Sequence, residues 1–178
     1  ELLATLRRLD SRPGAAEALA EEVGRRYDAE IAGVDSAIGD LLDGLRRMAL
    51  LDNTLVAVVG VEGEEFYEHG GRSHGQTLHE EVLRVPLILA GPGARAPGGG
   101  SFVEREPIEL VDVTRLLAKL GKLASPDFLQ GRLPPPFGPT LPDPVAHAVL
   151  RPVPGAVSVA LDAIRSRGWL RLHDPANG

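Results

Sequence analysis

The chain has 178 residues, of which 43% are hydrophobic and 25% are charged, so it is long enough for one domain with a hydrophobic core. Its formal net charge of −6 argues against a nucleic-acid partner, because phosphate backbones are bound by basic surfaces. The absence of cysteine excludes disulfides, cysteine-ligated metal sites and a cysteine nucleophile within these residues.

No apolar run approaches the roughly 18 residues of a membrane span, and no signal peptide is visible. The chain opens on Glu1 within a helical pattern, without a methionine, and it ends just after a predicted strand. We therefore expect a fragment of a longer polypeptide, whose localisation these residues leave unknown.

The first part of the chain predicts helices. Residues Glu1–Asp10 place four leucines on one helical face, and the stretch Ser11–Gly14 breaks that pattern. A long amphipathic helix is expected from about Ala15 to Leu50, because apolar residues recur every three or four positions. These residues are Tyr27, Ile31, Val34, Ile38, Leu41, Leu42 and Leu45.

The middle of the chain predicts the functional region. Two apolar runs, Thr54–Val61 and Val85–Leu89, are bounded by Asn, Gly and Pro and are typical of buried parallel strands. The polar loop between them is rich in Glu, His and Gly. Since α/β proteins place their chemistry at the carboxyl ends of such strands, we expect the site in this loop.

The remainder predicts an α/β sheet continued by a small antiparallel unit. A short strand is expected at Ser101–Glu104 and a helix at Val111–Leu120, with Gly121 as its C-cap. Seven prolines exclude regular structure from residues 125–144. Further strands are expected at Ala146–Leu150, Val157–Ile164 and Trp169–His173, the last two forming a hairpin around the turn at 165–168. We therefore predict an α/β portion at 1–124, a proline-rich connection at 125–144 and a strand unit at 145–178.

Several segments, taken in order, resemble the sulfatases of the alkaline phosphatase superfamily. The matching segments are YDAEIAGVDSAIGDLLDGL, LLDNTLVAVVG, GEEFYEHGG, SHGQTLHEEVLRVPLILAGPG, IELVDVTRLLAKLGKL and AIRSRGWLRLHDPANG. The resemblance implies an alkaline-phosphatase/sulfatase-like sheet flanked by helices, of which this chain is the C-terminal portion. It also implies a metal-dependent hydrolase of sulfate esters, working in the periplasm, outside the cell, at a membrane anchor or in lysosomes.

The chain departs from the family where the first strand ends. Family members have Asp-His there as metal ligands, whereas this chain has Val61 and Glu62. Valine offers no lone pair, but the carboxylate of Glu62 could still bind a hard cation. The family's nucleophile, a formylglycine made within a Cys/Ser-x-Pro-x-Arg motif, would lie upstream of Glu1. His74 matches the histidine of the family's GHG motif and is the catalytic position that survives.

Each of these residues also has an ordinary structural interpretation. His74 could be a solvated loop histidine, Glu62 a surface carboxylate, and Arg84 the partner of a structural ion pair. Glu64, Glu65, Glu68, Glu80 and Glu81 could hold a cation or form a solvated acidic rim. His69 is interpreted as a residue that shapes the loop.

Three functional hypotheses follow from the resemblance. The chain is a catalytically degenerate sulfatase-like protein with a binding or structural role. Alternatively, it is a diverged sulfatase, phosphoester hydrolase or phosphotransferase, whose remaining ligands lie upstream and which uses Ca²⁺, Mg²⁺ or Zn²⁺; a degenerate protein would need no metal. The third hypothesis is a structural half that needs the N-terminal part of the same domain, or a partner chain, to cover its exposed edge.

Overall fold

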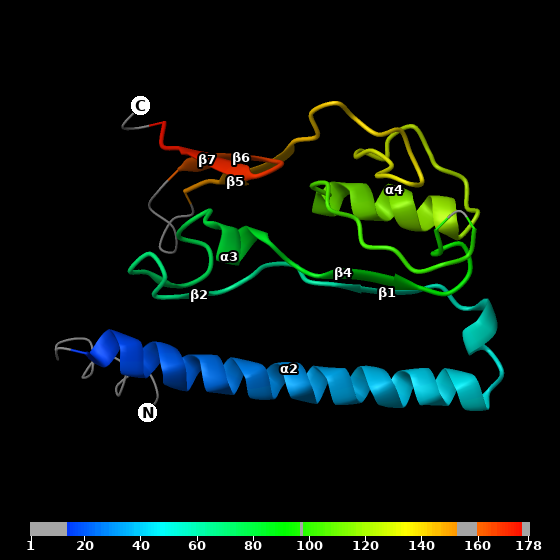
Figure 1. Ribbon diagram of the computed structural model, residues 1–178, viewed down its shortest axis with the longest axis horizontal. Helices are drawn as coiled ribbons and strands as arrows, with labels where there is room; N and C mark the ends of the chain where they lie inside the picture. The colour runs from blue at the N-terminus through cyan, green and yellow to red at the C-terminus, as the bar shows by residue number, and fades with distance from the viewer. Residues whose placement is uncertain (1–13, 97, 153–159, 176–178) are drawn as a thin grey trace.

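The computed structural model describes residues 14–96, 98–152 and 160–175 and arranges them in layers (Figure 1). A long helix, α2 (Ala15–Arg47), lies along one side of a strand pair, and helix α4 (Leu110–Leu120) lies on the other. The α/β class predicted from the sequence, with a sheet between helices, is thereby confirmed. The helix expected at Glu1–Asp10 lies outside the described residues.

Helix α2 follows the predicted amphipathic pattern and ends three residues earlier than expected. Its charged face carries local ion pairs, including Arg26 Nε to Glu22 Oε1 at 2.7 Å. Its apolar face stays largely open: Ile31 is 53% exposed and Leu41 60% exposed. One anchor is the ring of Tyr27, which packs edge-on against Phe66 with centroids 5.2 Å apart.

The strand pair consists of β1 (Val56–Val59) and β4 (Leu87–Ala90), joined to α2 by the 3₁₀ turn η1 (Leu51–Asn53). The two strands are antiparallel, with Val56 opposite Ala90, so the prediction of buried parallel strands was wrong. The chain between them folds beyond the end of β1 and never returns along its length, as a parallel pairing would require (Figure 1). The sheet is also half open, because the Ile88 side chain is 59% exposed.

The connection between β1 and β4 contains three short elements. These are the paired strands β2 (Glu65–Phe66) and β3 (Arg72–Ser73) and the one-turn helix α3 (Glu80–Leu83). They lie together at one end of the β1–β4 pair (Figure 1). The loop predicted to carry the site is therefore a small folded unit in its own right.

Helix α4 supplies the main buried apolar contacts and holds the proline-rich connection. Leu116 and Val113 point into the core, and a capping box links Glu109 with Asp112 at the helix start. Asp112 is fully buried and accepts the Arg132 backbone N–H at 2.6 Å. Gly121 ends the helix as predicted. Residues 125–144 contain no helix or strand, as expected from their prolines.

The strand expected at Ser101–Glu104 does not form. Its apolar residues are exposed and no neighbouring strand pairs with it among the described residues, so alternation alone was insufficient.

The C-terminal unit is a three-stranded antiparallel sheet in the order β5 (Ala146–Leu150), β6 (Leu161–Ser166), β7 (Trp169–His173). β5 and β7 have the predicted bounds, whereas β6 ends two residues later than expected and begins at Leu161, so that Ala160 lies outside the strand. Residues 157–159 of the predicted strand lie outside the described part. The β6–β7 turn is formed by Arg167 and Gly168, whose φ of 77° suits glycine. The division into regions 1–124, 125–144 and 145–178 stays a prediction.

No helix in the described part of the chain is both long and apolar enough to cross a membrane.

Candidate functional site

The loop that leaves β1 is pressed against helix α3. The Gly63 N–H donates to the Val82 carbonyl at 2.8 Å, and a Cβ at position 63 would stand 1.9 Å from the Glu81 carbonyl oxygen. Gly60 is similarly crowded, because a Cβ there would lie 2.9 Å from Val85 and Pro86 side-chain atoms. Gly63 thus lets the backbone approach α3, and Gly60 lets it approach the segment that leads into β4.

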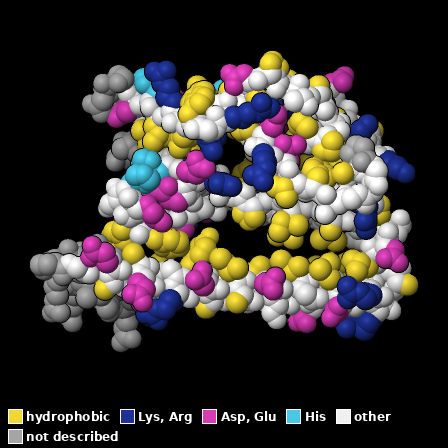
Figure 2. Space-filling view, in the orientation of Figure 1, with side chains coloured by type: hydrophobic (Ala, Val, Ile, Leu, Met, Phe, Trp, Pro, Cys, Tyr) yellow, Lys and Arg dark blue, Asp and Glu magenta, His cyan; other side chains and the backbone are white. Residues whose placement is uncertain are grey.

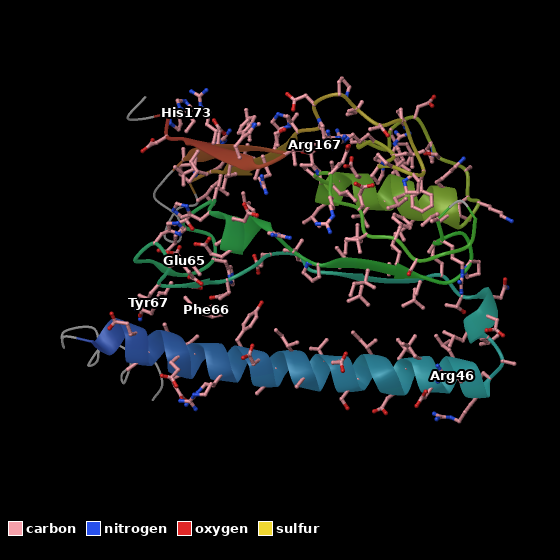
Figure 3. All side chains as sticks on the ribbon, in the orientation of Figure 1. Arg46, Glu65, Phe66, Tyr67, Arg167 and His173 are labelled. Atoms are coloured by element: carbon pink, nitrogen blue, oxygen red, sulfur yellow. The ribbon has the colours of Figure 1, made fainter. Side chains whose placement is uncertain are left out.

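Strand β2 places the side chains of Glu65 and Phe66 on opposite faces. Successive side chains of a strand point to opposite faces, so Glu65 turns away from the face on which Phe66 meets α2 (Figure 3). Glu65 is only 2% exposed and accepts hydrogen bonds from the Gly71 N–H at 2.8 Å and the Thr77 hydroxyl at 3.1 Å. A weaker bond comes from the His69 N–H at 3.3 Å. Glu65 thereby anchors the whole loop between β2 and α3.

His74 lies between two carboxylates, one of which belongs to the other predicted site residue. Its Nδ1 is 2.9 Å from Glu64 Oε2, and its Nε2 is 3.3 Å from Glu62 Oε1. The hydrogen bond with Glu64 raises the pKa of His74 above its ordinary value; partial desolvation opposes this, and the Glu62 charge adds to it. The structure therefore brings Glu62 and His74 together, with Glu64, in a histidine–carboxylate group at the molecular surface.

A second group of ligating side chains lies around Glu65. His69 Nδ1 is 2.6 Å from Glu81 Oε1, and the His69 ring stacks on the His79 ring with centroids 3.7 Å apart and an angle of 9°. Ligating atoms of Glu65, His69 and Glu81 lie within 4.8 Å of one another. Burial pushes the pKa of Glu81 upward, but hydrogen bonds from its backbone and from His69 outweigh this and lower it.

Sequence reasoning missed this second group. It grouped Glu65 and Glu81 with three other glutamates that could hold a cation or form a solvated rim, and it interpreted His69 as a loop-shaping residue outside that group. The contact between His69 and Glu81 spans twelve residues and no helical spacing announces it, so only the folded loop reveals it.

Arg84 has the structural role expected from its position. Its Nη1 lies 3.6 Å from Glu80 Oε1, and the same oxygen is 3.2 Å from Arg165 Nη2 on β6. Glu80 thus joins α3 to the C-terminal sheet.

A cavity of about 1730 Å³ lies between the strand pair, α4 and the C-terminal sheet, and Figure 2 shows the hollow. Its lining includes Glu62, Leu116 of α4, Arg105 and Arg165 of β6. Glu62, which the sequence predicted as a metal ligand, therefore borders a space large enough for a small-molecule ligand.

Comparison with known proteins supports one family. The family model described as Sulfatase matches residues 9–123. The chain is 36% identical over 100 residues to the choline-sulfatase of Rhizobium meliloti (strain 1021), a match that covers 56% of this chain and 18% of that protein. It is 30% identical over 105 residues to arylsulfatase K of Canis lupus familiaris, covering 59% of this chain and 19% of the relative.

A solved structure has a similar fold. It is described as a complex with its substrate, D-glucosamine-2-N,6-O-disulfate, and it aligns with a TM-score of 0.60 at 22% identity. The alignment covers 83% of this chain and 31% of the solved chain. The chain thus spans less than a third of each of these three proteins.

Proposed function

Because the chain belongs to the sulfatase family, we propose that it forms the C-terminal portion of a sulfatase-like domain in which the metal site has degenerated. Its role would then be binding or assembly instead of ester hydrolysis. The observation that carries the proposal is that Val61 and Glu62, which follow β1, replace the family's two metal ligands.

These positions do not suit the family's divalent metal. Val61 offers no donor atom and is 77% exposed, and the Glu62 carboxylate faces the His74 ring at 3.3 Å. The raised pKa of His74 favours a positive charge beside that carboxylate, and a cation would have to compete with it. Glu62 also stands apart from the one three-residue group of possible ligands in the described part of the chain. A site that lacks one ligand and neutralises another loses the preorganised charge on which metal-assisted hydrolysis depends.

The arrangement of His74 supports one alternative function. A histidine whose pKa is raised, next to a cavity wall that contains Glu62, could donate a proton to a leaving group. This alternative is a diverged sulfatase or phosphoester hydrolase, in which other parts of a longer protein supply the nucleophile and any metal. His74 would act as the acid, and Glu62 and Glu64 would hold its ring in place.

The exposed apolar surfaces support a partner. Figure 2 shows a row of hydrophobic side chains along α2 facing a second row beneath β1 and β4. Since the related proteins are several times longer than the matched region, we propose that the rest of a sulfatase-like domain covers these rows. That part could be supplied by the same polypeptide or by another chain.

Turnover by the protein at its full natural length separates the two functions. An aryl sulfate and an aryl phosphodiester would be assayed with Ca²⁺, Mg²⁺ or Zn²⁺, beside the variants Glu62→Gln and His74→Asn. Degeneracy predicts no turnover above the uncatalysed background in any of the three proteins. Turnover at ordinary enzyme rates, lost at least about a hundredfold in His74→Asn, would overturn the proposal in favour of the alternative.

A further inference from the structure

We propose that the C-terminal sheet, strands β5 to β7, is a hinged wall of the large cavity, held closed by ion pairs and opened when these are screened. The proposal concerns a movement within this chain and is independent of whether the domain hydrolyses esters.

Basic residues of the sheet meet glutamates that lie outside it. Arg167, in the β6–β7 turn, pairs with Glu106, and Nη2 of Arg165 on β6 lies 3.2 Å from Oε1 of Glu80 on α3. Figure 3 shows Arg167 at the end of the sheet that is nearest to α4. In both contacts the sheet contributes the positive charge, so the sheet is attracted to its surroundings as a whole.

A third contact joins the sheet to the start of α4. The carboxylate of Glu109 accepts the His147 backbone N–H at 2.8 Å, and the His147 ring Nδ1 lies 3.7 Å from the same oxygen. His147 belongs to β5, which is the edge strand opposite β7. Because the three contacts are distributed across the sheet, they hold it as one body.

Glu106 makes Arg167 the main latch of the closed position. The Glu106 side chain is only 12% exposed, and its Oε2 is buried without a hydrogen-bond partner in the described part of the chain. A shielded carboxylate needs a counter-charge or water, and loss of its partner is costly. Without Arg167, the carboxylate would gain water only if the sheet moved away from it.

Beneath the sheet lies the cavity of about 1730 Å³, where a second packed layer would be expected. Apolar residues of the inner sheet face contribute to its lining. They are Ala146, Ala148, Leu150, Ala163 and Leu170. Since burial of apolar surface is the usual force between layers, a sheet above a hollow depends more on its ion pairs.

The proline-rich connection supplies the hinge. At one end, the Arg132 backbone N–H is held by its hydrogen bond to α4. At the other end, Asp143 and Pro144 accept the Ser166 hydroxyl at 2.9 and 3.1 Å, so they move with the sheet. Residues 133–142 lie between these anchors and contain neither helix nor strand. Changes in their backbone angles would let the sheet swing away from α4.

Pulsed electron paramagnetic resonance on the full chain would measure this movement, because the absence of cysteine allows two nitroxide labels to be placed selectively. The labels would be attached through Lys119→Cys on α4 and Val149→Cys on β5, both exposed positions. Dilution with unlabelled chain would suppress distances between molecules. We expect one narrow distance distribution at about 50 mM NaCl and a longer component at about 1 M, with the ratio of open to closed raised at least about tenfold.

Matched substitutions test the latch. Arg167→Gln should raise the ratio of open to closed at low salt by at least about tenfold, because it removes the counter-charge of Glu106. Arg171→Gln makes the same exchange at an exposed arginine of β7, which has no ion-pair partner among the residues that the structure describes. This control should leave the distance distribution unchanged.

The salt response of the labelled chain, with Arg167 in place, is a test that does not require the latch variant to fold. Circular dichroism at both salt concentrations should be the same, because the sheet moves without unfolding. An identical distance distribution at the two concentrations would overturn the proposal. Equal distributions in Arg167→Gln and Arg171→Gln, or loss of secondary structure together with the longer distances, would also overturn it.

Discussion

His74 shows how a single side chain can acquire a charge from its neighbours. Both ring nitrogens face carboxylates, from Glu64 at 2.9 Å and Glu62 at 3.3 Å, so the protonated ring can donate in two directions. The family motif placed Glu62 and His74 in one loop, and that much could be predicted. The contact between Glu64 and His74 could not, because it joins residues ten positions apart and depends on how the folded loop places them.

The pKa of His74 should therefore lie above the ordinary histidine value, and Glu64→Gln should lower it more than Glu62→Gln, since the Glu64 hydrogen bond is the larger cause. A proton held more tightly in the folded state stabilises it fully below the unfolded pKa. That contribution disappears as the pH rises through the folded pKa. Following the ring protons by magnetic resonance across pH 5–9 would measure both values. Equal shifts in the two variants would contradict the assignment.

At the scale of elements, helices and strands were predicted correctly where the signals that define them lie within the segment itself. Helix α4 and strands β5 and β7 have periodicity, caps or turns within their own sequence, and they formed close to the predicted bounds. Ser101–Glu104 has strand-like alternation but no partner, and the direction of β4 relative to β1 depends on how the intervening loop folds. Pairing is a non-local property, and no window of residues contains it.

Helix α4 offers a sharp test, because Asp112 serves both the helix start and the proline-rich connection. It accepts the Glu109 N–H at 3.0 Å and the Arg132 N–H at 2.6 Å while fully buried. Asp112→Ala should lower the free energy of unfolding by about 1.5–3 kcal/mol, because buried donors lose a charged acceptor. Urea denaturation would measure this.

The matched control is Asp35→Ala on the exposed surface of α2, which should change stability by less than about 0.5 kcal/mol. Equal effects of the two substitutions would show that Asp112 does not hold the connection.

For the whole molecule, the main feature is apolar surface left without a cover. Helix α2 contacts the rest through Tyr27 and the turn at its end, and most of its apolar face is exposed. Length and composition predicted a hydrophobic core. They could not show that most of the apolar face of α2 would remain outside that core. This exposed apolar surface agrees with the short match to longer proteins, which covers 18% of one relative and 31% of a solved structure with a similar fold.

The isolated chain should accordingly self-associate, and Ile31→Glu should weaken that association by at least about tenfold, because a charge would be buried at the contact. Ser36→Glu adds the same charge elsewhere on the helix circumference and should have little effect. Sedimentation equilibrium over a range of concentrations would measure both. A chain that remains monomeric at high micromolar concentration would argue against this surface as an interface.

The contact between Gly63 and α3 fixes the path of the loop backbone, whereas the side chains of the neighbouring residues determine which ligands the loop can bind. Any side chain at position 63 would collide with the Glu81 carbonyl, whereas the side chains of Val61 and Glu62 are 77% and 56% exposed. Substitutions can therefore accumulate at the two neighbouring positions while the backbone keeps its path. A lineage that lost its original ligands there would retain a ready-made frame, on which one or two further substitutions could install a different chemistry.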